Sequence, residues 1–308
     1  MAGARYPGCL RGLRAMTVPA VEFHGVTVRR ARRDLVRDVS FDVPSASIHA
    51  VLGHNGAGKT TLMRALAGSI PTRRGLIRST GVPSVLLVGT SLPREMTVAH
   101  LLEHRRRVEG AARVDVARAT ARCGVQGFLT RRFGQLSTGM AQRVAIAAEL
   151  IADAPIIVLD EPTTGLDPQG VDALMRLLVG LRAEGRTIII CSHDLARLEL
   201  VCDGVTCVRA GEVTRHGPID RVVAGLPTPG HYLRTDDDEL ADRILAEHGC
   251  PADRTPRGLH IDARRSVTEI ARCLHDQVRI TEVTVDSSLF ERLYRRDASA
   301  PGTRGDVA

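Results

Sequence analysis

Apolar and polar side chains alternate in two stretches near the start of the chain, at residues 21–28 and 35–43. This period of two predicts a pair of strands joined by an arginine-rich turn at 29–33. Three later runs are short, rich in β-branched residues and apolar throughout. Such runs are typical of strands buried on both faces of a parallel sheet. They are residues 48–52, 156–159 and 187–191.

A helical period separates these strands. It is found at residues 60–67 and 171–181, and through an Arg- and Ala-rich segment at 97–150 that begins with Val98, Leu101 and Leu102. Strands that alternate with helices predict an α/β fold with a central, mostly parallel sheet. We expect the segment at about 90–150 to be an inserted helical subdomain.

The character of the chain changes near Gly217, and a linker rich in Pro and Gly follows at 226–230. The pattern beyond it predicts strands and helices in alternation, at 231–234, 237–248, 258–261, 267–276 and 278–285. We therefore expect a main domain at 21–217 and a small C-terminal α+β domain at 226–296. Residues 1–20 and 297–308 are expected to be disordered.

The composition is that of a globular protein, with 44% hydrophobic and 25% charged residues. The net charge is +7, yet Lys59 is the only lysine and every other basic side chain is arginine. No apolar run approaches the roughly 18 residues of a membrane-spanning helix. The chain has no Trp, three Tyr and five Phe, so no base-stacking surface and no nucleic-acid partner are expected. Seven scattered cysteines without a C-x-x-C pair predict reduced thiols.

A phosphate-binding loop follows the predicted strand at 48–52 and precedes the predicted helix at 60–67. It matches the pattern G-x-x-x-x-G-K-[ST], in which successive backbone N–H groups surround phosphate oxygens. We expect Lys59 to contact the β- and γ-phosphates, and the Thr60 hydroxyl to ligate Mg²⁺. The nucleotide-binding residues are Gly53, His54, Asn55, Gly56, Ala57, Gly58, Lys59, Thr60 and Thr61.

Two carboxylates end the apolar run at 156–159. The strand delivers Asp160 to its exposed end, where the carboxylate can hold Mg²⁺ through water. Glu161 is then placed to orient the attacking water or to accept its proton. An apolar strand that ends in two acids is weak evidence alone, but it is strong evidence in a chain with a phosphate-binding loop.

Further motifs resemble the ATP-binding subunits of ABC transporters. Residues 136–143 read L-S-T-G-M-A-Q-R and are similar to the family's signature L-S-G-G-Q, with Ser137 and Gly139 retained. Residues 162–168 are similar to the family's D-loop, with Asp167 as its aspartate. His193, after the run at 187–191, matches the family's switch histidine. The resemblance covers about residues 21–217.

The resemblance implies a P-loop NTPase that hydrolyses ATP with Mg²⁺, as a head-to-tail homodimer with two ATP molecules at its interface. One chain's phosphate-binding loop, Asp160, Glu161 and His193 then face the other chain's Ser137 and Gly139, in a γ-phosphate site at a helix N-terminus. It also implies a separate polytopic permease and a cytoplasmic location at the inner face of the cell membrane. The signature form L-S-T-G-M, and the C-terminal extension that ends with residues 286–290, are similar to those of drug- and antibiotic-exporting members of the family.

Several positions depart from the family pattern. Thr138 and Met140 stand where glycine and glutamine are common in the signature. The aromatic residue that stacks on adenine falls near Arg30 or Ala31, and Arg30 could take its place. The family's Q-loop glutamine is expected at 88–90 and is absent. The glutamine normally contacts Mg²⁺ or water and couples the ATPase to the permease.

Two other functions remain open at this stage. A soluble ABC ATPase of translation or DNA repair is disfavoured, because the chain has one phosphate-binding loop, no sustained heptads and no zinc-site spacing. A nucleotide-binding regulator with weak hydrolysis is suggested by the missing glutamine and aromatic residue. The substrate that a transporter would carry is not encoded here, because that pocket lies in the permease.

Overall fold

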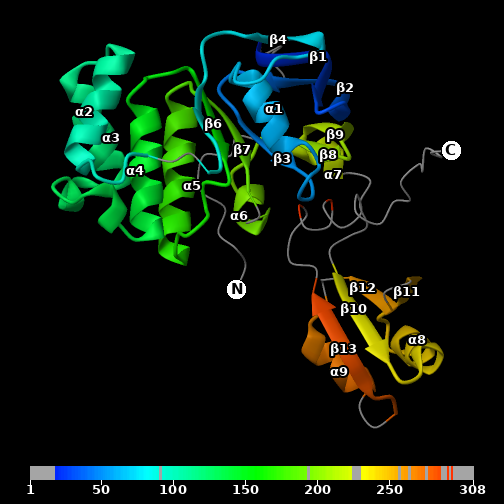
Figure 1. Cartoon of the computed structure of the whole chain (residues 1–308). Coiled ribbons are helices and arrows are strands. Elements are labelled where there is room, and N and C mark those ends of the chain that lie inside the picture. Colours follow the sequence, from blue (N-terminus) through cyan, green and yellow to red (C-terminus); the bar gives the residue numbers. More distant parts are fainter. Residues whose placement is uncertain are drawn as a thin grey trace. The chain divides into compact units, whose positions relative to one another are not determined.

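A computed structural model describes residues 18–89, 92–192, 195–223, 230–255, 258–262, 265–274, 277–285, 290 and 293. The chain divides into two units, one comprising Met1–Val222 with Arg296–Ala308 and the other Val223–Arg295 (Figure 1). The sequence placed the second domain at 226–296. The linker predicted at 226–230 lies outside the described residues apart from Gly230.

An antiparallel sheet of three strands, in the order β2-β1-β4, begins the first unit. Its strands are β1 (Pro19–Arg30), β2 (Arg33–Pro44) and β4 (Arg74–Ser79). The predicted turn at 29–33 was too long, because only Ala31 and Arg32 connect β1 to β2. Both have positive φ, 47° and 65°, as two-residue hairpins require. Arg29 pairs with Asp34 at 2.5 Å, so the strands stay paired to the tip.

A six-stranded sheet in the order β5-β6-β7-β3-β8-β9 forms the centre of this unit. All neighbouring strands are parallel except β8 and β9. Every residue of β3, β6 and β7 is buried, as their apolar runs predicted. The predicted α/β fold with a mostly parallel sheet is therefore confirmed. The strands are β3 (Ile48–Leu52), β5 (Ser84–Leu86), β6 (Ile156–Asp160), β7 (Thr187–Cys191), β8 (Gly204–Arg209) and β9 (Glu212–Pro218).

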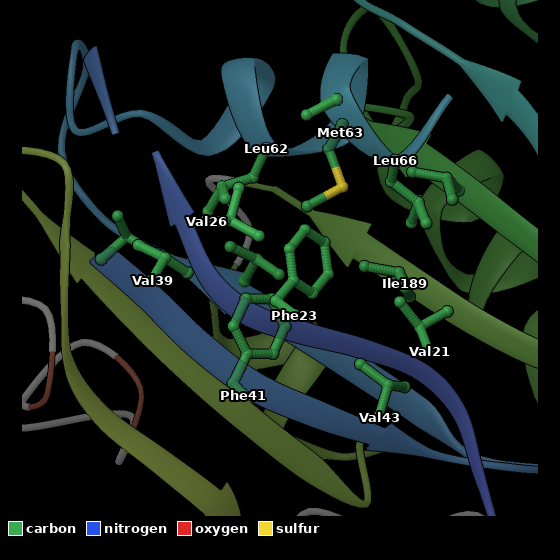
Figure 2. Close-up of a cluster of buried hydrophobic side chains, with 14 of the residues drawn as sticks. Val21, Phe23, Val26, Val39, Phe41, Val43, Leu62, Met63, Leu66 and Ile189 are labelled. Atoms are coloured by element: carbon green, nitrogen blue, oxygen red, sulfur yellow. The ribbon is translucent and has the colours of Figure 1, made fainter. Parts of the chain in front are cut away.

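Helix α1 (Lys59–Leu66) packs its apolar side against both sheets (Figure 2). Met63 points toward Phe23 of β1, whose ring stacks on Phe41 of β2 with centroids 4.3 Å apart, and Leu62 points toward Val26. This packing fixes the N-terminus of α1 at the end of β3. Helix α5 (Pro168–Ala183) packs against β3 and β7. It is longer than the predicted 171–181, because Asp167 caps it and Pro168 fits its first turn.

Three helices form the inserted subdomain, within the predicted span of 90–150. They are α2 (Val98–Glu109), α3 (Arg113–Cys123) and α4 (Thr138–Leu150), with 3₁₀ turns at Gln126–Phe128 and Phe133–Gln135. Their apolar faces share a separate core around Leu102, Val144 and Ile151. The short helices α6 (Leu195–Glu199) and α7 (Ile219–Val223) lie later in the chain.

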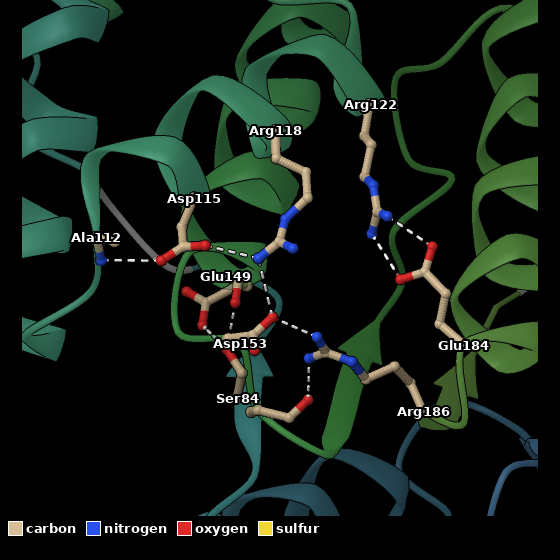
Figure 3. Close-up of polar contacts among 10 residues, drawn as sticks. Ser84, Ala112, Asp115, Arg118, Arg122, Glu149, Asp153, Glu184 and Arg186 are labelled. Carbon is tan, nitrogen blue, oxygen red and sulfur yellow. Dashed lines mark hydrogen bonds and ion pairs between the residues drawn. The ribbon is translucent and has the colours of Figure 1, made fainter.

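Ion pairs connect this helical subdomain to the parallel-sheet part of the unit (Figure 3). Arg122 of α3 pairs with Glu184 at 2.6 Å, after the end of α5. Arg118 pairs with Asp153 at 3.3 Å, and Arg186 also pairs with Asp153. Ion pairs as exposed as these contribute at most about 1 kcal/mol each to the free energy of unfolding. They orient the subdomain more than they stabilise the fold.

The second unit has a four-stranded antiparallel sheet in the order β11-β12-β10-β13. The elements follow the β-α-β-β-α-β sequence of a split βαβ motif. Leu233, Leu259 and Ile261 face Ile244 of α8 and Ile270 of α9 in one core. The elements are β10 (Gly230–Thr235), α8 (Asp238–Glu247), β11 (Ala252–Thr255), β12 (Gly258–Asp262), α9 (Val267–Leu274) and β13 (Ile280–Val285).

One strand in this unit begins later than predicted, and another was not predicted. The strand predicted at 278–285 begins only at Ile280, because the backbone N–H of Val278 still donates to Leu274 O at the end of α9. Strand β11 was not predicted, since its sequence A-D-R-T lacks an apolar alternation. The end of the helix predicted at 267–276 lies outside the described residues.

His49, in the middle of β3, is buried and uncharged. Its Nε2 hydrogen-bonds Thr206 Oγ1 at 2.8 Å, and that hydroxyl also bonds His216 Nδ1 at 3.0 Å. Burial, together with the nearby His216, lowers the pKa of His49 to about 3. The unfolded chain binds this proton near pH 6.5 and the folded chain does not, so stability is complete above pH 6.5 and falls as the pH drops toward 3.

We therefore expect the free energy of unfolding to fall between pH 7.5 and 5.5 by about 1.4 kcal/mol more in the native chain than in His49→Gln. Urea unfolding at the two pH values measures this difference. His104→Gln is the matched control, because His104 is exposed on α2. Equal pH dependence of the native chain and His49→Gln would contradict the prediction.

Candidate functional site

The phosphate-binding loop leaves the buried end of β3 and runs into α1. Gly53 begins it, and a Cβ atom there would lie 2.2 Å from the backbone oxygen of Val208 in β8. No side chain fits at that distance, so only glycine lets the loop leave the sheet here. The backbone N–H of Ala57 donates to His54 O at 3.0 Å and closes the loop on itself.

Lys59 is the first residue of α1 and is 9% exposed. Its ammonium donates to Gly53 O at 2.5 Å and to His54 O at 3.2 Å. The charge therefore lies within the loop, supported by two carbonyl oxygens of the loop itself. An ammonium is a compact donor that fits such a space, whereas a guanidinium is a wide planar fork.

A pocket of about 500 Å³ opens over this loop. It brings together the predicted nucleotide-binding loop, the two predicted carboxylates, Val88 at the start of the predicted Q-loop span, and Leu35, which the sequence did not indicate. Val88 follows β5 at the carboxyl edge of the parallel sheet, where ligand sites form. The lining residues are Leu35, His54, Asn55, Gly56, Ala57, Gly58, Lys59, Thr60, Thr61, Val88, Asp160 and Glu161.

Thr60 and Asp160 meet across β7, which lies between β3 and β6 in the sheet. The Thr60 hydroxyl donates to Asp160 Oδ2 at 2.7 Å, and Asp160 is 2% exposed. A hydroxyl and a carboxylate are oxygen donors of the kind that Mg²⁺ accepts beside phosphates and water. The described residues contain no cluster of three or more His, Cys, Asp or Glu that would hold a metal ion alone. The residues thus fit a Mg²⁺ ion that arrives with a nucleotide.

Glu161 extends into the pocket from a strained backbone. Its φ is +54°, which is uncommon for a residue with a side chain and costs roughly 1–3 kcal/mol. Its backbone N–H donates to Cys191 O at 2.9 Å, which holds the turn at the end of β6 against β7. Burial raises the pKa of the Cys191 thiol well above its usual value, and the Asp160 carboxylate adds to this effect. The sulfur therefore stays protonated, and Glu161 is the pocket group suited to act as a base.

Ser137, Gly139 and Asp167 do not line this pocket. Ser137 is exposed and caps α4 by accepting from the Met140 N–H at 3.3 Å. Asp167 caps α5 by accepting from the Gly170 N–H at 2.8 Å. Their predicted contact with nucleotide therefore needs a surface that this chain's own pocket does not supply.

His193 lies outside the described residues. Ser192, directly before it, shares a hydrogen bond of 2.6 Å with Thr163 of the segment after β6. Arg30 and Ala31 are exposed on the β1–β2 hairpin and do not line the pocket. The pocket presents the half-exposed Val88 at the start of the predicted Q-loop span, and Thr90 at its end lies outside the described residues.

Comparison with known proteins identifies the family. The family model described as "ABC transporter" matches residues 36–164. The ABC transporter ATP-binding protein NatA of Bacillus subtilis (strain 168) is 35% identical over 202 residues, which cover 60% of this chain and 82% of that protein. This chain belongs to the ABC transporter ATP-binding proteins. A zinc import ATP-binding protein, ZnuC of Cereibacter sphaeroides, is 37% identical over 66% of this chain and 84% of its own length.

Solved structures share the fold of this ABC ATPase. The structure of an ATP-binding subunit of an ABC transporter has a TM-score of 0.62 and 25% identity, covering 66% of this chain and 91% of that one. A dimeric structure of MJ0796, a bacterial ABC transporter cassette, has a TM-score of 0.60 and 21% identity, over 65% and 98% of the two chains. The chain is thus an ATP-hydrolysing subunit of an ABC transporter. In its described part, no helix is both long enough and apolar enough to span a membrane.

Proposed function

We propose that this ABC ATPase works as a head-to-tail homodimer that closes on two ATP molecules and drives a separate membrane permease. The observation that carries the proposal is the separation of the motifs. The phosphate-binding loop, Asp160 and Glu161 share one pocket, whereas Ser137 and Gly139 do not line it. A second copy, turned head to tail, supplies the missing serine hydroxyl and the N-terminus of α4.

Each pocket residue has one role in this proposal. Lys59 and the loop N–H groups bind the β- and γ-phosphates. Thr60 and Asp160 would hold Mg²⁺, which neutralises phosphate charge when bound. Glu161 takes a proton from the attacking water, and His193 contacts the γ-phosphate. Strands β3 and β6 end at the same edge of the sheet, which supports a common site for the phosphate-binding loop, Asp160 and Glu161.

We also propose that the chain lies at the cytoplasmic face of the cell membrane and serves export. The resemblance of the signature form L-S-T-G-M and of residues 286–290 to drug- and antibiotic-exporting members supports the export direction. Import is represented among the relatives by the zinc import ATP-binding protein ZnuC, so the direction is tested separately from the ATPase role. The second unit is proposed to support the dimer or to regulate it.

Purification of the tagged full chain from solubilised native membranes, followed by mass spectrometry, tests this function. We expect a polytopic membrane protein to co-purify in stoichiometric amount, and washing with chelator and no nucleotide to leave it bound. Transport by the identified permease in inside-out vesicles then gives the direction. Recovery of ribosomal or DNA-repair proteins in place of a permease would contradict the proposal and favour a soluble ABC ATPase.

A further inference from the structure

The start of α4 and the segment after β6 pack so closely that glycine is required on both sides. Gly165 has φ +78°, and a Cβ atom there would lie 2.4 Å from Thr138 Cγ2 and 2.9 Å from Thr138 Cβ. On the other side, a Cβ atom at Gly139 would lie 2.8 Å from Gly165 O. Gly165 is therefore enclosed by the methyl group of Thr138 and by the backbone of Gly139.

The enclosed segment leads directly to the proposed base. The backbone N–H of Thr164 donates to Glu161 O at 3.2 Å, and that of Leu166 donates to Thr163 O at 3.1 Å. At its far end, Asp167 caps α5. The segment from Glu161 to Asp167 is thus a series of tight turns. Two short hydrogen-bonded turns connect Gly165 to Glu161.

Thr138 is one of the departures from the family pattern, in which glycine is common at this position. A glycine there would leave the space in front of Gly165 without a side chain. The residue is otherwise exposed, so its methyl group is placed on the D-loop without being part of a core. The contact costs little to form, because a β-branched side chain has few rotamers to lose.

We infer that Thr138 is a positioning residue: its Cγ2 methyl holds the D-loop against the N-terminus of α4, so that Glu161 and the pair Ser137–Gly139 move together. This inference rests on the proposed head-to-tail dimer. In that dimer Glu161 serves one ATP, while Ser137 and Gly139 of the same chain serve the other. A rigid connection between them makes hydrolysis at the two sites cooperative.

Substitutions at Thr138 separate the methyl group from the hydroxyl. Thr138→Val keeps a methyl at the Cγ2 position, Thr138→Ser keeps only the hydroxyl, and Thr138→Gly removes both. Hydrogen–deuterium exchange of the nucleotide-free full chain reports the amides of Thr164 and Leu166. We expect exchange to be several-fold faster in the Ser and Gly variants than in the native chain, and unchanged in the Val variant.

The dependence of ATP hydrolysis on ATP concentration provides the second measurement. With two coupled sites the Hill coefficient lies between about 1 and 2. We expect it to fall to about 1 in Thr138→Ser and Thr138→Gly, and to keep its native value in Thr138→Val. A lower kcat with an unchanged Hill coefficient would show a merely structural role and overturn the coupling.

The two measurements distinguish the possible failures. Equal exchange rates in all variants would overturn the positioning role of the methyl group. Native-like slow exchange in Thr138→Ser would assign the contact to the hydroxyl, and it would also overturn the positioning role of the methyl group. A native Hill coefficient of 1, together with no ATP-dependent dimer of Glu161→Gln, would overturn the proposed dimer and with it the coupling. The exchange data would then still decide whether the methyl holds the loop.

Discussion

Lys59→Ala is expected to raise the Kd for ATP at least about 100-fold, a loss of about 2.7 kcal/mol. The ammonium lies inside the loop, within hydrogen-bond distance of Gly53 O and His54 O. Hydrogen bonds between charged groups contribute about 1.5–3 kcal/mol each, and the phosphates accept more than one of them. Isothermal titration calorimetry with ATP and Mg²⁺ measures the change directly.

Two further variants sharpen this test. Arg78→Ala removes one positive charge from the exposed strand β4, which does not line the pocket, and is expected to leave the Kd unchanged. Lys59→Arg keeps the charge but places a wide, planar guanidinium where the native lysine is only 9% exposed. The affinity of this variant for ATP should therefore approach that of Lys59→Ala. ATP affinity retained in Lys59→Ala would show that the loop is not the phosphate site.

Glu161→Gln is expected to lower kcat about 1,000-fold while changing the Kd for ATP little, because general bases contribute about 10²- to 10⁴-fold. Glutamine keeps the shape of the side chain but cannot accept the proton of water. Unhydrolysed ATP should then hold the dimer closed, so that gel filtration with ATP and Mg²⁺ shows twice the native mass. Steady-state phosphate release gives the rate.

Glu212→Gln is the matched control, because Glu212 is exposed and forms an ion pair with Arg37, and neither residue lines the pocket. Its kcat should equal the native value. Glu161→Gly should be as inactive as Glu161→Gln but more stable to heat, because glycine adopts a positive φ without strain. Native kcat in either Glu161 variant would show that another group acts on water.

The sequence predicted those parts of the fold whose local pattern agrees with their burial. Strands β3, β6 and β7 have apolar runs because both of their faces are covered. The phosphate-binding loop begins at Gly53, directly after β3, and the first carboxylate of the site, Asp160, ends β6. Their common edge places the two motifs together, so one fold rule predicts the proximity of Thr60 and Asp160. The α/β class and most of the pocket could therefore be predicted.

Features formed by long-range packing could not be predicted. Strand β4 is almost wholly exposed and has no alternation to reveal it. Strand β9 closes the sheet antiparallel to β8 by a turn at Ala210, whose positive φ no residue preference indicates. Leu35 of β2 lines the pocket through a contact between segments that the sequence does not connect. The enclosure of Gly165 by Thr138 depends on two segments that are distant in sequence.

The single lysine gives this protein a built-in chemical label. Any reagent that acylates ε-amines can modify one side chain only, and that side chain is Lys59 in the phosphate-binding loop. In the purified chain, the extent of acylation at Lys59 therefore reports how many loops are empty. In most proteins such a measurement requires every other lysine to be replaced first, whereas this chain has no other lysine.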